Sequence, residues 1–126
     1  MKANTVVLVV EDEALVRLDV ISQIEDEGFT VIEAADADAA IRILETNPDV
    51  AILFTDIDMP GSMDGLKLSA AVRDRWPPVK IIVTSGHRHI RNEDLPVVGR
   101  FVGKPYDGQL VAASLREMMM AAQAVG

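Results

Sequence analysis

The sequence predicts an α/β fold in which a parallel sheet carries helices on both faces. Short apolar runs typical of buried strands alternate along the whole chain with longer segments whose apolar residues recur every three or four positions. The length of 126 residues and the hydrophobic share of 49% suit one domain with its own core. Strands that alternate with helices favour parallel strands joined by crossover helices.

Five apolar runs are expected as strands. Each is short and bounded by polar or turn-forming residues, and the first four are rich in β-branched residues. The runs cover residues 5–10, 30–34, 50–55, 79–83 and 100–103.

The segment after the first strand, residues 14–27, has the periodicity of an amphipathic helix that ends at Gly28. Its expected core-facing stripe comprises Val16, Leu18, Val20, Ile21 and Ile24. The second helix is capped by Asp36 or Asp38 and ends at Asn47.

The third helix is expected from Asp64 to Trp76, where two prolines stop it. A last helix begins after Asp107. Between the fourth and fifth strands, residues 86–96 contain few large apolar side chains, so the fourth helix is expected to be short or irregular. With so few apolar anchors, little packing would oppose a rearrangement of this segment.

Charged and polar side chains follow four of the predicted strands. An acid pair, Glu11 and Asp12, follows the first strand and Asp56 follows the third. Thr84 ends the fourth strand, and Lys104 follows the fifth. The carboxyl ends of parallel strands meet at one edge of the sheet, where open α/β folds bind ligands. These side chains are therefore expected to form one site.

Three carboxylates that converge on one edge must protonate, separate or bind a cation, because like charges repel. Ligands that are all oxygen atoms favour a hard ion, and Mg²⁺ is the expected cofactor. The Lys104 amine and the Thr84 hydroxyl suit phosphoryl oxygens. This combination predicts phosphoryl transfer to Asp56, with an aspartyl phosphate as the product.

Composition excludes several other classes. The chain has no cysteine, so disulfides and thiol chemistry are excluded. No apolar run is long enough for a membrane helix, and the formal net charge of −8 disfavours direct nucleic-acid binding. We expect one cytoplasmic domain over residues 1–126, without linker, repeat or second domain.

Together these positions resemble the receiver domain of two-component response regulators, over essentially the whole chain. The matching elements are Val9-Val10-Glu11-Asp12-Glu13, Phe54-Thr55-Asp56-Ile57-Asp58-Met59-Pro60, Met63-Asp64-Gly65, Thr84-Ser85-Gly86 and Lys104-Pro105-Tyr106. The loop at Gly61-Ser62-Met63 departs from the family pattern by one extra residue. The resemblance implies a stand-alone receiver of the chemotaxis type. It also implies a flavodoxin-like three-layer fold with a five-stranded sheet in the order 2-1-3-4-5.

The resemblance also implies roles for single residues. Asp56 would accept a phosphoryl group from a histidine kinase or a phosphotransfer protein, and Thr84 and Lys104 would bind the phosphoryl oxygens. The implied ligands of Mg²⁺ are Glu11, Asp12, Asp56 and the backbone carbonyl of Asp58. Thr84 and Phe101 would form the switch, although Phe101 is equally compatible with permanent core packing. Lys104-Pro105 resembles the cis peptide of the family.

The expected function is phosphorelay signalling, in which phosphorylation switches the affinity for a downstream protein partner. Such a receiver is no enzyme toward other substrates and catalyses only its own phosphorylation and dephosphorylation. A monomer or weak dimer without nucleic-acid or membrane binding is expected. Two alternatives remain at this point. Asp56-Ile57-Asp58 also matches the motif of haloacid-dehalogenase-type aspartyl phosphatases, and a binding module that ignores phosphate could use the same fold.

Overall fold

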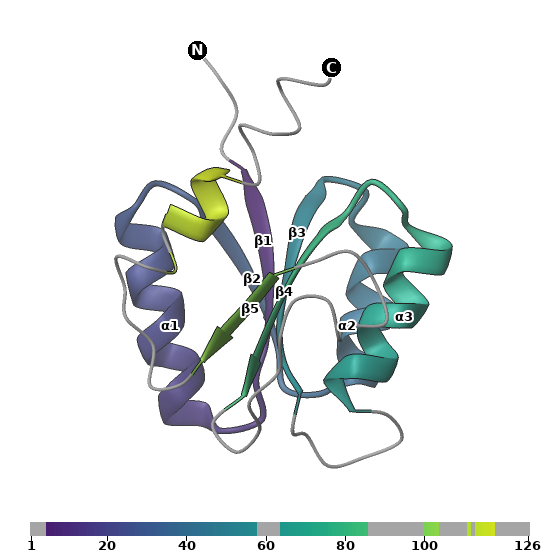
Figure 1. The fold of residues 1–126 in the computed structure, drawn as a ribbon, viewed down its shortest axis with the longest axis horizontal. Helices are drawn as coiled ribbons and strands as arrows, with labels where there is room; N and C mark the ends of the chain where they lie inside the picture. Colours follow the sequence, from purple (N-terminus) through teal and green to yellow (C-terminus); the bar gives the residue numbers. More distant parts are fainter. Residues whose placement is uncertain (1–4, 58–63, 86–99, 104–110, 112, 118–126) are drawn as a thin grey trace.

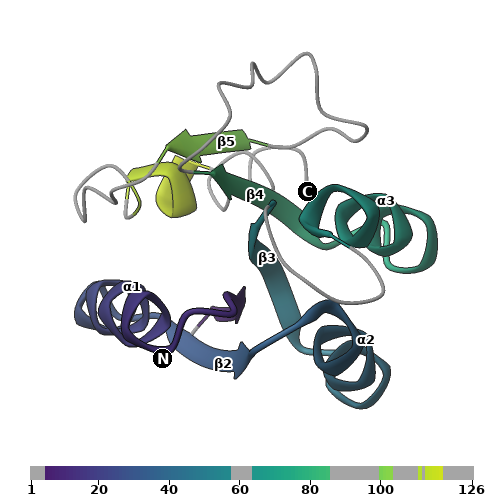
Figure 2. The same ribbon diagram turned by 90° about the horizontal axis from the view of Figure 1, so that it is seen from below.

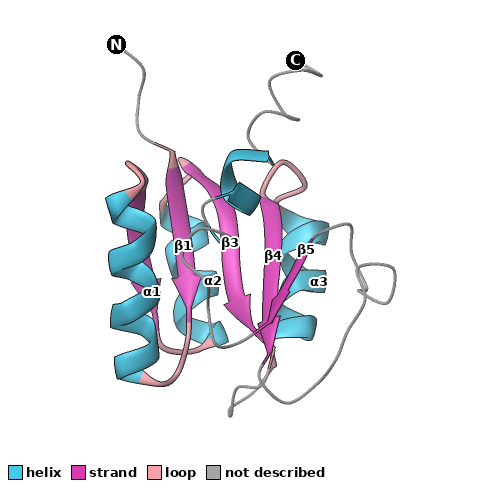
Figure 3. Ribbon diagram, turned by 60° about the vertical axis from the view of Figure 1, so that its left-hand side comes forward, coloured by secondary structure: helices cyan, strands magenta, loops and turns pink. Residues whose placement is uncertain are grey.

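The computed structural model describes residues 5–57, 64–85, 100–103, 111 and 113–117 (Figure 1). Its five strands form one parallel sheet in the order β2-β1-β3-β4-β5. The strands are β1 (Val6–Val10), β2 (Thr30–Ala34), β3 (Val50–Asp56), β4 (Lys80–Ser85) and β5 (Arg100–Gly103). Every neighbouring pair of strands is parallel, and the arrows of β1, β3, β4 and β5 point the same way in Figure 3, so the carboxyl ends meet at one edge of the sheet. The predicted α/β fold with a parallel sheet is confirmed.

Helices cover both faces of the sheet. The helices are α1 (Ala14–Asp26), α2 (Ala37–Thr46) and α3 (Gly65–Arg75). Residues 111 and 113–117 are also helical. Figure 2 shows α1 on the same face as this last helical segment, and α2 beside α3 on the other face. The sheet is therefore the middle of three layers.

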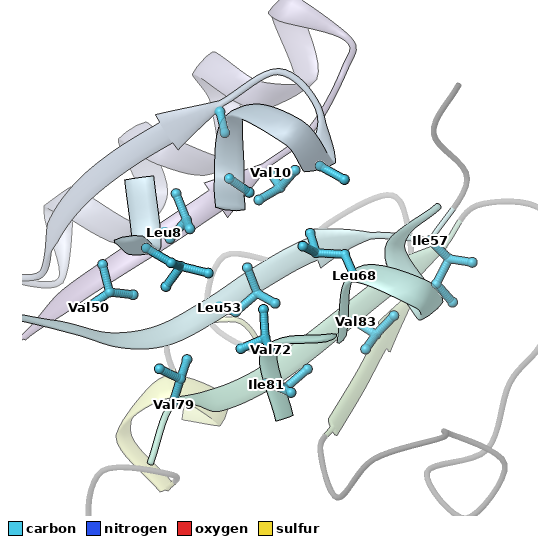
Figure 4. Close-up of a cluster of buried hydrophobic side chains, with 14 residues drawn as sticks. Leu8, Val10, Val50, Leu53, Ile57, Leu68, Val72, Val79, Ile81 and Val83 are labelled. Carbon is cyan, nitrogen blue, oxygen red and sulfur yellow. The ribbon is translucent and has the colours of Figure 1, made fainter. Parts of the chain in front are cut away.

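Each face of the sheet has its own buried apolar cluster. One cluster packs α2 and α3 against the sheet and includes Leu44. Its members Leu68 and Val72, from α3, are labelled in Figure 4. The other packs α1 and the last helical segment against the opposite face, with Ile24 and Leu115 among its members. Residues that alternate along β1 enter the two clusters in turn, as expected for a strand buried on both faces.

The helix boundaries follow from side-chain caps. Asp36, rather than Asp38, is the N-cap of α2, and its carboxylate accepts a hydrogen bond from the backbone N–H of Ala39 at 2.8 Å. The Asp64 carboxylate accepts one from the N–H of Lys67 at 2.9 Å and starts α3, which ends before Trp76 as predicted.

One expectation about α1 is wrong. Leu18 was expected on the core-facing stripe, but 57% of it is exposed, and Leu15 is 81% exposed. The buried face of α1 consists of Val20, Ile21 and Ile24. At about 100° per residue, Leu15 lies nearly opposite this face and Leu18 lies beyond its edge. Two large apolar side chains of α1 therefore face outward.

The expected short fourth helix, residues 86–96, lies outside the described residues. Among the helices that the structure describes, none is long and apolar enough to span a bilayer.

Candidate functional site

The carboxyl ends of β1 and β3 place three carboxylates together. Glu11 and Asp12 directly follow β1, and Asp56 is the last residue of β3. One ligand oxygen from each of these three residues lies within 4.8 Å of the other two. Glu11 and Asp56 are buried, with 1% and 3% of their surface exposed, whereas Asp12 is exposed. The cluster is therefore buried at Glu11 and Asp56 and exposed to solvent at Asp12.

Strand register brings Thr84 to the same edge. In the parallel ladder Asp56 is the partner of Thr84, which is fully buried. The backbone carbonyl of Thr84 accepts a hydrogen bond from the N–H of Ile57 at 2.8 Å. The ends of β3 and β4 are therefore tied together directly beside the carboxylate cluster, as the positions of these residues in the sequence suggested.

Glu11 is held from several directions. Its side-chain Oε2 accepts a hydrogen bond from the N–H of Glu13 at 3.2 Å, and its N–H donates to the carbonyl of Ala34 at 3.1 Å. The Arg17 guanidinium donates to the backbone carbonyl of Glu11 at 2.8 Å and to the carboxylate of Glu33 at 2.8 Å. Arg17 therefore links the end of β1 to β2 and α1. Sequence reasoning missed this residue, because an arginine in an amphipathic helix is ordinarily a surface charge.

Several predicted site residues cannot be placed at this edge. Asp58, Lys104 and Pro105 lie outside the described residues. Phe101 is part of β5, where it is the ladder partner of Val83, but its side chain is not described. Their roles stay predictions.

The donor chemistry of the cluster fits a divalent cation. All three donors are carboxylate oxygens, which hard ions such as Mg²⁺ and Ca²⁺ prefer over softer metals. Mg²⁺ usually binds proteins through one or two carboxylates and keeps several waters, which an open-sided cluster permits. The residues Glu11, Asp12 and Asp56 can therefore hold a metal ion.

Comparison with known families identifies the class of protein. The family model of the response regulator receiver domain matches residues 7–116. The chain belongs to this family, whose members serve in two-component signalling, and in which aspartate phosphorylation and Mg²⁺ binding are typical. The resemblance noted in the sequence is confirmed.

The chain is similar to segments of curated proteins of two kinds, a sensor kinase and a putative response regulator. It is 32% identical over 123 residues to the sensor kinase CckA of Brucella abortus, covering 94% of this chain and 13% of that protein. It is 37% identical over 82 residues to a putative response regulator, NtrX-like, of Rickettsia felis, covering 64% of this chain and 17% of that one. The chain thus spans less than a fifth of these curated relatives.

Solved structures show the same fold. A CheY-like response regulator receiver domain protein from Methanospirillum hungatei superposes with a TM-score of 0.89 at 21% identity, over 98% of this chain and 100% of the other. A response regulator receiver protein from Pseudomonas putida gives a TM-score of 0.81 at 27% identity, over 93% of this chain and 99% of the other. The flavodoxin-like fold implied by the resemblance is confirmed.

Proposed function

We propose that Asp56 accepts a phosphoryl group from a histidine kinase or phosphotransfer protein, and that this modification changes the affinity for a downstream protein. The observation that carries the proposal is the meeting of Asp56 with Glu11 and Asp12 at the end of β3, in a chain of the receiver family. A buried carboxylate beside two further acids is unfavourable by itself. It is suited to a reaction that brings in cations and a phosphoryl group.

Each residue of the site has a separate proposed role in phosphoryl transfer. A carboxylate oxygen of Asp56 attacks the phosphorus while the bond from phosphorus to the donor's imidazole nitrogen breaks. Glu11, Asp12 and Asp56 would hold Mg²⁺, whose chemistry when bound would be to offset negative charge on the phosphoryl oxygens. Thr84 supplies a hydroxyl donor to these oxygens, and Lys104 is proposed as a second, cationic donor. The chain then acts as a catalyst only on its own phosphoryl group.

The exposed leucines of α1 support a protein as the phosphoryl donor. Leu15 and Leu18 lie on one side of α1, about one and two turns beyond Asp12. A donor that brings an imidazole to Asp56 also covers the surface around the start of α1. Apolar side chains that face outward there provide the buried contact that a protein interface needs and a small phosphoryl donor does not.

Labelling of the acceptor tests the proposal. The parent, incubated with Mg²⁺ and radiolabelled acetyl phosphate or a histidine kinase, should take up one phosphoryl group per chain and then lose it. Asp56→Asn should abolish labelling, because an amide is no usable nucleophile. Asp74→Asn, at an exposed acid near the end of α3, is the matched control and should label like the parent. Equal labelling of Asp56→Asn and the parent would contradict the assignment.

Two further measurements separate the alternatives. Repeated turnover of p-nitrophenyl phosphate, rather than labelling that reaches one per chain and decays, would favour an aspartyl phosphatase. Beryllofluoride with Mg²⁺ imitates the aspartyl phosphate and should shift the amide resonances of Ile57 and Thr84, next to the acceptor. Unchanged spectra would favour a binding module that ignores phosphate.

A further inference from the structure

Gly65 occupies the contact between α3 and the end of β3. It is the first residue of α3 and is buried. Its N–H donates a hydrogen bond to the backbone carbonyl of Ile57 at 3.0 Å. The helix therefore starts directly against the peptide that follows Asp56.

No side chain fits at this position. A Cβ on Gly65 would lie 1.9 Å from the backbone oxygen of Asp56, 2.7 Å from its carbonyl carbon and 2.8 Å from Cα of Ile57. Real Cβ atoms essentially never approach other atoms within 3.0 Å, so the contact would have to open by about 1.1 Å, the difference between 3.0 and 1.9 Å. All three obstructing atoms are backbone, so no rotamer change can relieve the clash. Two of them belong to the proposed acceptor itself.

Both sides of this contact are held in place. On the strand side, Ile57 donates its N–H to Thr84, and β3 pairs with both β1 and β4. On the helix side, Leu68 is fully buried, and the Ser69 hydroxyl donates to the Gly65 carbonyl at 2.8 Å. Neither element can move away alone, so a forced separation is shared and part of it reaches the Asp56 peptide.

We propose that Gly65 is a positioning residue for the phosphoacceptor: because it lacks a side chain, α3 can hold the Asp56 peptide where its carboxylate meets Glu11 and Asp12. The inference rests on the proposed function of Asp56. A shift of about 1 Å in a reacting group costs on the order of a hundredfold in rate. The clash demands a separation of that size, so even a small side chain at position 65 should affect phosphorylation.

The test compares two substitutions in α3. Gly65→Ala introduces the clash at the start of α3. Val72→Ala removes buried methyl groups from the same helix about two turns after Gly65, and so destabilises the domain away from the Gly65 contact. The variants are studied where urea titrations show that they are folded. Gly65→Ala should slow labelling by acetyl phosphate about a hundredfold and weaken Mg²⁺ binding in calorimetry. Val72→Ala should keep both within about twofold of the parent.

Amide hydrogen exchange supplies a readout that needs neither metal nor phosphoryl donor. In Gly65→Ala, the amides of Ile57 and residue 65 should exchange faster than in Val72→Ala, because their hydrogen bonds span the strained contact. A folded Gly65→Ala with the labelling rate and Mg²⁺ affinity of the parent overturns the inference. A parent that is not labelled at all instead overturns the proposed function, so the two failures are distinguishable.

A second variant covers the case in which Gly65→Ala does not fold. Ser69→Ala introduces no clash and removes only the hydroxyl that holds the Gly65 carbonyl. Labelling should slow a few-fold while the urea midpoint changes little, because alanine is a good helix former. Labelling at the rate of the parent would show that the position of Gly65 does not affect the acceptor.

Discussion

Removing the charge of Asp56 should stabilise the metal-free domain. The ligand oxygens of Glu11 and Asp56 lie within 4.8 Å of each other, and both residues are buried. Two unit charges at that separation repel by about 3.5 kcal/mol at an effective dielectric constant near 20. Asp56→Asn keeps the shape of the side chain and removes this repulsion. Because the pair relaxes in part, we expect a gain in the free energy of unfolding of about 1–2 kcal/mol without metal.

Mg²⁺ should stabilise the parent more than it stabilises Asp56→Asn. A ligand that binds only the folded parent at ten times its Kd raises the free energy of unfolding by about 1.4 kcal/mol. For a domain of this size that corresponds to roughly 3–6 °C in Tm. Asp56→Asn lacks one anionic ligand, so its gain from the same Mg²⁺ concentration should be much smaller.

Urea titrations at constant ionic strength, with and without Mg²⁺, measure both effects. Asp12→Asn is the matched variant, because it removes the same charge from the exposed side of the cluster. It should lose the metal response but gain less stability without metal, since water screens an exposed carboxylate more strongly. The reasoning fails if millimolar Mg²⁺ leaves the parent unchanged, or if Asp56→Asn responds to Mg²⁺ as strongly as the parent.

Two further predictions concern α1. Replacing Leu15 and Leu18 together by serine should lower labelling by a histidine kinase at least tenfold. Labelling by acetyl phosphate and the urea midpoint should stay unchanged, because both side chains face outward; an equal loss with both donors would refute a docking role. Arg17→Gln should lower the free energy of unfolding by about 1 kcal/mol, because the Glu11 carbonyl loses a charged donor. Glu33→Gln should cost less, since the side chain of Glu33 is 53% exposed; equal costs in urea would show that the ion pair is the important contact.

The sequence was sufficient to predict the strands and helices that the structure describes, and to predict that Glu11, Asp12 and Asp56 lie together. Strands and helices have different apolar periods, and the ends of parallel strands share one edge, so Glu11 and Asp56 could be brought together without coordinates. Leu18 was misplaced because an apolar residue at the margin of a helical stripe has the same pattern whether a core or a partner covers it. The contacts of Arg17 with Glu33 and of Gly65 with Asp56 join different elements, and no local pattern encodes them.

The register of β3 explains why Asp56 is level with Glu11. Val6 pairs with Val50, but Val7 pairs with Ile52, so β3 contains one extra residue, Ala51, at an irregularity in the ladder. From there the pairing continues to Val10 and Thr55, which places Asp56 opposite the residue after β1, Glu11. If the ladder continued regularly from Val6 and Val50, Thr55 instead of Asp56 would lie opposite Glu11. Because side chains alternate along a strand, the side chains of Asp56 and Glu11 would then point to opposite faces of the sheet. The irregularity at the start of β3 therefore determines which residue enters the acidic cluster at its end.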